Sequence, residues 1–179
     1  MKKYHRILHQ LLLYLVFSVY IVILFAILFR TSHPSRSINI VPMRSICFYL
    51  SGVDIPAYSP NEIIIYSFGF TNFVGNIVLF IPLGVYFALF REGRESKKTI
   101  FGVFLVSLSA ELVQYIFKMG IGDIDDVILN TFGGMIGIGA YHILLVKLKD
   151  ANKVRHVIEV IAPMVGIASF LILFLCSKA

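Results

Sequence analysis

The sequence predicts an all-α membrane protein, a polytopic helical bundle with about five transmembrane helices in a single domain, residues 1–179. Three observations lead to this fold class: an apolar composition, five apolar runs of spanning length, and an unequal division of basic residues between the loops. Hydrophobic residues make up 58% of the chain and charged residues 15%, whereas soluble domains contain roughly 45–50% and 25%. A bilayer accommodates the surplus of apolar side chains.

The five apolar runs each meet the length that a membrane helix requires. A helix rises 1.5 Å per residue, so about 20 apolar residues cross a hydrocarbon layer of about 30 Å. Lipid offers no hydrogen bonds to the backbone, so each run is predicted to be a helix. The first run is too long for a cleaved signal peptide, which predicts a retained anchor. The predicted spans are residues 7–29, 72–90, 99–117, 127–146 and 157–176.

The basic residues predict the orientation. Cytoplasmic loops carry more Lys and Arg than outer loops. With the N-terminus inside, the inner segments contain eleven of the 16 basic residues, and the outer segments contain five. We therefore predict a multi-pass protein of the bacterial cell membrane that contacts membrane lipids. Loop charge accounts for the net charge of +6, so no nucleic-acid partner is expected.

The first outer loop, residues 30–71, is the only long one, and loops of this length usually carry structure or function. Ser59, Pro60 and Glu62 fit the N-cap, N1 and N3 positions of a capping box. They predict a short extra helix from Pro60 to about Phe68 that ends at Gly69.

A candidate site follows from the depth of polar residues within the spans. Glu111 is the acidic residue placed well inside a span, about 18 Å from its inner end, with Gln114 on the same helix face. Asn76 and Asn130 each lie about 6 Å below the outer boundary. We predict an outward-facing polar pocket with acidic residues at its mouth. The predicted binding cluster comprises Asn76, Glu111, Gln114, Asp123, Asp126 and Asn130.

Structural roles are an alternative for several of these side chains. Asn and Gln often join membrane helices through hydrogen bonds, and Asp at a helix N-terminus is favourable for reasons of the helix dipole alone. Oxygen ligands from Asp123, Asp125 and Asp126 are weak candidates for binding a hard cation, and no cofactor is expected. Four residues are predicted to shape the helices through kinking or close packing: Pro82, Gly84, Gly133 and Gly137.

Three stretches resemble the VanZ-like family of small bacterial membrane proteins, within residues 36–140. Asn39-Ile-Val-Pro42 resembles a motif of the first outer loop, and Asn76 to Gly84 resembles an Asn…Phe-x-Pro-x-Gly motif. The third stretch, Glu111-x-x-Gln114 followed by Asp123 to Gly133, is the most specific. Where the family usually has an Arg, this chain has Gly120, and Lys118 is the nearest cation.

The resemblance implies a role in resistance to glycopeptides of the teicoplanin type. Our leading hypothesis is a non-enzymatic factor acting at the outer face on a cell-wall precursor, a lipoglycopeptide or lipid. One alternative is a membrane-embedded transferase or hydrolase for envelope lipids, with Glu111 as acid/base and the Asp cluster as a metal site. Another is a small proton-coupled transporter or flippase that uses Glu111 as a relay.

Overall fold

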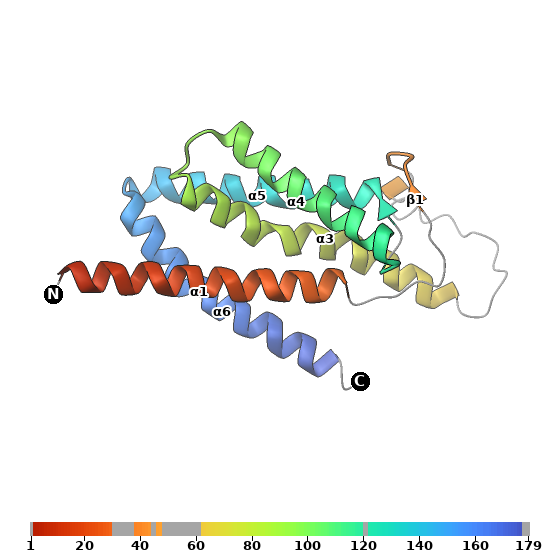
Figure 1. Ribbon diagram of the computed structural model, residues 1–179, viewed down its shortest axis with the longest axis horizontal. Helices are drawn as coiled ribbons and strands as arrows, with labels where there is room; N and C mark the ends of the chain where they lie inside the picture. The colour runs from red at the N-terminus through yellow and green to blue at the C-terminus, as the bar shows by residue number, and fades with distance from the viewer. Residues whose placement is uncertain (1, 30–37, 44–45, 48–61, 120–121, 177–179) are drawn as a thin grey trace. The chain divides into compact units, whose positions relative to one another are not determined.

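The computed structural model describes residues 2–29, 38–43, 46–47, 62–119 and 122–176. It does not describe the side chains of residues 2–6, 9, 62–72 and 164–176. Long helices dominate the described residues (Figure 1). They are α1 (Lys2–Leu28), α3 (Glu62–Phe90), α4 (Ser96–Phe117), α5 (Ile124–Leu148) and α6 (Ala151–Cys176), with the short strands β1 (Ile38–Asn39) and β2 (Gly122–Asp123).

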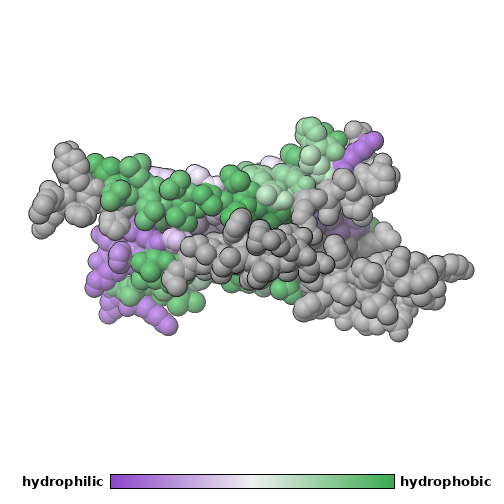
Figure 2. All heavy atoms as spheres, turned by 90° about the horizontal axis from the view of Figure 1, so that it is seen from below, coloured by the Kyte–Doolittle hydropathy of each residue, from purple (hydrophilic) through white to green (hydrophobic). Residues whose placement is uncertain are grey.

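Four helices contain stretches long and apolar enough to cross a membrane. They are Gln10–Leu28, Phe73–Phe90, Ser96–Phe117 and Ile124–Leu148. Their exposed surface is rich in large hydrophobic side chains such as Leu15, Val22 and Phe101, and Figure 2 shows hydrophobic residues along the helices. In water this exposure would be unfavourable, but facing lipid it is the expected arrangement. The predicted fifth span lies in α6, which runs through Pro163 without interruption, and its crossing of the membrane stays a prediction.

The predicted short helix in the first outer loop is wrong in its end point. Residues 62–68 are helical, but α3 continues through Gly69 to Phe90 as one helix of 29 residues. A glycine in a helix costs only about 1 kcal/mol, whereas breaking a helix beside lipid leaves several backbone groups without partners. Continuing the helix is therefore favoured. Ser59 and Pro60, the start of the predicted capping box, lie outside the described residues.

The chain divides into two compact units, one made of residues 1–27 and 143–179 and the other of residues 28–142. The first contains nearly all of α1 and the whole of α6, with Leu13, Leu24, Val154 and Ile158 buried. The second contains α3, α4, most of α5 and both strands, and it holds every residue of the predicted binding cluster. The prediction of a single domain stays a prediction.

Glycines bring α3 and α5 into backbone contact within the second unit. A β-carbon added at Gly133 would lie 2.1 Å from the carbonyl oxygen of Ile77, and one at Gly137 would lie 2.0 Å from that of Ile81. The same addition at Gly84 would meet the Gly134 carbonyl oxygen at 2.0 Å. Because successive contacts advance by four residues on both helices, α3 and α5 run in the same direction. Only glycine permits this approach.

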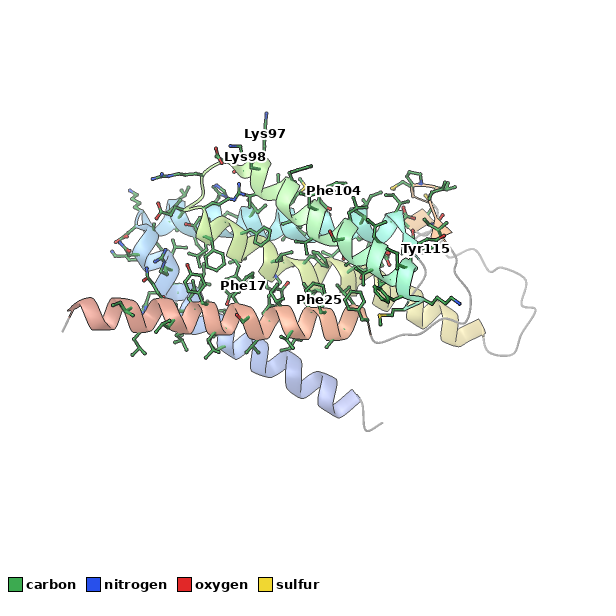
Figure 3. The ribbon with its side chains drawn as sticks, in the orientation of Figure 1. Phe17, Phe25, Lys97, Lys98, Phe104 and Tyr115 are labelled. Atoms are coloured by element: carbon green, nitrogen blue, oxygen red, sulfur yellow. The ribbon has the colours of Figure 1, made fainter. Side chains whose placement is uncertain are left out.

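Helix α4 packs beside this pair and returns in the opposite sense. Val103 of α4 is fully buried, and its Cγ1 would lie 2.4 Å from a β-carbon at Gly134. The turn before α4 carries exposed ion pairs, and Lys97 and Lys98 project from the first turn of α4 (Figure 3). A hydrogen bond from the Lys98 ammonium to the Glu95 carboxylate, 2.6 Å long, lowers the pKa of Glu95. Such exposed pairs add little stability, so packing holds the three helices together.

The glycine contacts predict a matched pair of substitutions in α5. Gly137→Ala should lower the free energy of unfolding by about 1–3 kcal/mol, because the added methyl overlaps the Ile81 carbonyl. Gly139→Ala is the control, since a β-carbon there meets nothing within 4 Å and alanine favours the helix by up to about 1 kcal/mol. Denaturant unfolding of the detergent-solubilised protein measures both. Equal stability of the two variants would contradict the close contact.

Candidate functional site

A parallel pair of two-residue strands brings distant parts of the second unit together. Ile38 pairs with Gly122 and Asn39 pairs with Asp123. Strand β2 lies between α4 and α5, so the pairing fixes residues 38–43 at the end where α4 finishes and α5 begins (Figure 1). A β-carbon at Gly122 would contact Tyr115 of α4 at 3.4 Å and Ile38 at 3.6 Å, and Figure 3 shows Tyr115 near this end.

Asp123 starts α5 and holds β1 with the same carboxylate. Its Oδ1 accepts a hydrogen bond of 2.9 Å from the Asp125 backbone N–H, which is the bond that an N-cap residue makes to the second residue of a helix. The same oxygen accepts a bond of 2.9 Å from the Asn39 side-chain amide. The helix cap and the long-range contact are thus made by one side chain.

Asp125 is the most deeply buried acidic residue of the site, with no exposed surface. Its two oxygens accept hydrogen bonds from backbone N–H groups of the first loop, Oδ1 from Met43 at 2.5 Å and Oδ2 from Ile46 at 3.3 Å. A buried carboxylate requires such compensation, and charge-assisted bonds supply it. Asp125 therefore clamps the loop to the first turn of α5.

Glu111 connects α4 to the same arrangement. Its side chain is 6% exposed, and its Oε2 accepts a hydrogen bond of 3.0 Å from the Asp123 backbone N–H. Glu111, Asp123 and Asp125 thus form a connected series, which we name the carboxylate network. Each carboxylate in it accepts a hydrogen bond from a backbone amide, so the network positions the chain where α4, α5 and the loop meet.

A second polar contact lies one helical turn deeper. The Nδ2 of Asn130, which is fully buried, donates a hydrogen bond of 2.9 Å to Ser107 of α4. Ser107 precedes Glu111 by four residues and shares its helix face. The Oδ1 of Asn130 and the Nδ2 of Asn76 are buried without a hydrogen-bond partner. Asn76 directly precedes Ile77, which contacts Gly133, so Asn76 and Asn130 lie within about one turn along adjacent helices.

Gln114 forms its hydrogen bond with a different partner. Its Nε2 donates a hydrogen bond of 2.8 Å to the Leu28 carbonyl, while its Oε1 is buried without a partner. In the described part of the chain, no hydrogen bond joins any two of Asn76, Glu111, Gln114 and Asn130. The predicted cluster therefore contains three separate polar contacts, and the common pocket stays a prediction.

The remaining predicted residues have less defined positions in the site. Asp126 is partly buried at the start of α5, and Lys118 is exposed in the left-handed region that ends α4. Gly120 lies outside the described residues. Among the residues that the structure describes, no group of three or more His, Cys, Asp and Glu is arranged to hold a metal ion. Oδ1 of Asp123 and both oxygens of Asp125 accept hydrogen bonds from amide N–H groups.

Sequence reasoning missed two parts of this arrangement and one buried carboxylate in the other unit. Ser107 shares a helix face with Glu111, a spacing that could have revealed it. The contact of Asn39 with Asp123 spans 84 positions and has no local signal. Glu159 in α6 is 8% exposed, and its Oε2 lies 3.7 Å from the Nδ1 of His156. It falls just inside the predicted fifth span, and that position was a usable signal for a buried carboxylate.

Four apolar helices of spanning length, with polar contacts buried between them, are the features of a multi-pass membrane protein. The chain belongs to the VanZ/LLP1 family, whose family model matches residues 11–145. Protein VanZ of Enterococcus faecium is 40% identical over 73 residues, a match that covers 40% of this chain and 45% of that protein. The chain thus aligns with less than half of that relative's length. No solved structure matches the chain.

The Asp125 clamp predicts a local change in backbone protection. In Asp125→Asn, one oxygen becomes an NH₂ group that cannot accept a bond, so the amides of Met43 and Ile46 lose a charged acceptor. Hydrogen exchange of a peptide covering residues 38–47 should accelerate about tenfold or more, because bonds to charged groups contribute about 1.5–3 kcal/mol.

Asp150→Asn is the matched control for this measurement. Asp150 accepts a hydrogen bond of 2.8 Å from the Asn152 backbone N–H before α6, and Asn caps a helix about as well as Asp. Exchange of residues 38–47 should match the wild type in this variant. Unchanged exchange in Asp125→Asn as well would show that Asp125 does not hold the loop.

Proposed function

We propose that this protein is a membrane factor that raises resistance to teicoplanin-type glycopeptides by acting at the outer face of the bacterial cell membrane. Membership of the VanZ/LLP1 family and the similarity to Protein VanZ support the class of function. The excess of basic residues in the inner segments supports a cytoplasmic N-terminus. In that orientation, the carboxylate network and residues 38–43 lie at the outer boundary.

The carboxylate network is the main support for the proposed mode of action. Asp123 and Asp125 direct oxygens to the Asn39 amide and to the backbone N–H groups of Met43 and Ile46. These hydrogen bonds from the loop to the carboxylates support a positioning role, in which the helices present the first outer loop to its partner. We propose that the partner is membrane lipid, a cell-wall precursor or the lipoglycopeptide itself.

The same geometry bears on the enzymatic alternative. A metal-assisted or acid/base mechanism needs carboxylate oxygens directed at a reacting group. Here Oδ1 of Asp123 accepts two hydrogen bonds, and both oxygens of Asp125 accept one each. This arrangement favours the non-enzymatic factor, and no contact in the described residues favours a transporter over it.

Glu111 variants in a teicoplanin-susceptible host test the proposal. The wild-type chain should raise the minimum inhibitory concentration of teicoplanin. Glu111→Ala should lose most of that increase, because the Asp123 N–H loses its acceptor. Glu95→Gln, an exposed carboxylate in the turn before α4, is the control and should retain the increase. Immunoblots of membranes would establish equal amounts of each protein.

Glu111→Gln separates positioning from acid/base chemistry. The Gln side chain keeps an oxygen that can accept the Asp123 N–H, but it cannot exchange a proton at neutral pH. A positioning role predicts near wild-type resistance for Glu111→Gln, and a proton-transfer role predicts loss as complete as in Glu111→Ala. A wild-type chain that leaves teicoplanin susceptibility unchanged would refute the function itself.

A further inference from the structure

The segment of residues 38–43 exposes its apolar side chains and turns its polar groups inward. Ile40 is 71% exposed and Val41 is 53% exposed, with Ile38 and Met43 also exposed. Asn39, its one polar side chain, contacts Asp123 and also accepts a hydrogen bond from the Val41 N–H. Surface loops in water usually present polar side chains outward, and this segment does the opposite.

The outward position of these side chains is held by specific contacts. Strand pairing fixes Ile38 and Asn39 against Gly122 and Asp123. Met43 has φ 67°, a left-handed conformation uncommon for a residue with a side chain, and its N–H is bound by buried Asp125. The structure therefore holds the segment in one conformation with Ile40 and Val41 at its tip.

The segment lies at the end of the membrane-spanning stretches. Strand β2, to which it pairs, is the next element after α4, whose stretch ends at Phe117, and it directly precedes the α5 stretch, which starts at Ile124. Ile116 and Phe117 in the last turn of α4 are more than half exposed, so an apolar lipid-facing surface reaches this level. Gly122 lies between Tyr115 of α4 and Ile38, which joins the segment to that surface.

The charges around the segment are also compatible with a position at the surface of the lipid. Residues 38–43 contain no charged side chain, and the nearby carboxylates of Asp123 and Asp125 accept hydrogen bonds from the segment itself. Lys118, at the end of α4, is exposed, and a cation at a membrane boundary attracts anionic headgroups. Exposed apolar side chains on a segment without charged residues are typical of segments that enter the interface between headgroups and acyl chains.

We infer that residues 38–43 form an interfacial anchor whose apolar tip, Ile40 and Val41, inserts into the lipid of the membrane that the helices cross. The anchor is independent of the resistance function and requires only the position of the segment at the ends of α4 and α5. Its partner is a lipid surface, recognised through burial of apolar side chains.

Fluorescence quenching of single-cysteine variants tests the insertion. In a full-length Cys47→Ser, Cys176→Ser background, a new cysteine is introduced by Ile40→Cys, Leu112→Cys or Lys97→Cys and labelled with an environment-sensitive dye. The proteins are reconstituted in vesicles of phosphatidylcholine and phosphatidylglycerol. Leu112, exposed in the α4 span, is the lipid-facing control, and Lys97, exposed near the start of α4, is the aqueous control.

Insertion predicts that nitroxide lipids quench the label at position 40, as they do at position 112. Iodide quenching at position 40 should be roughly threefold weaker than at position 97, because the probe lies below the headgroups. Iodide access equal to that at position 97 would overturn the inference. A label at position 40 shielded from both quenchers would also overturn it, since protein rather than lipid would then cover the segment.

Discussion

The buried charge of Asp125 is the constraint on which the described end of the second unit depends. A carboxylate without exposed surface must find hydrogen-bond donors within the protein. Met43 and Ile46 supply them from a segment about 80 positions earlier. Satisfying one charge therefore determines where the first loop lies relative to α5.

The carboxylates and the glycines act at different levels of the same three helices. Gly84, Gly133 and Gly137 set the distance between α3 and α5 through backbone contact. Asn130 and Ser107 join α5 to α4 nearer the start of α5, and Glu111 joins α4 to β2 at the end. Close packing without specific donors would allow the helices to slide, whereas these hydrogen bonds select one register.

The features that follow from a pattern of nearby residues, such as the apolar spans, were the ones that the sequence predicted. Four predicted spans coincide with apolar helices, and the predicted C-terminal ends at Phe90 and Phe117 match α3 and α4. The end predicted at Gly69 was wrong because an isolated glycine is only a weak helix breaker beside lipid. Asn76, Glu111 and Asn130, which depth along the spans singled out, are buried in the structure, and their common pocket stays a prediction.

Partners could not be predicted, because a helical period gives the face of a residue but not the neighbour beyond it. Gln114 shares a face with Glu111, yet its amide reaches Leu28 while Glu111 reaches Asp123. Asp125 drew attention as a weak metal ligand, and the structure shows it bound to backbone amides. The family resemblance marked the residues of the carboxylate network and also Asn39, without indicating that they contact one another.

The same direction of α3 and α5 has a consequence for biogenesis. Helix α4 must cross back before α5 can enter, so the glycine surface around Gly84 has no partner until the whole of residues 62–148 has been synthesised. During that interval the backbone of α3 that α5 later contacts is exposed to lipid, to the insertion machinery and to other helices. Assembly of the three-helix unit is thus an obligatorily late event, completed only when translation has passed α5.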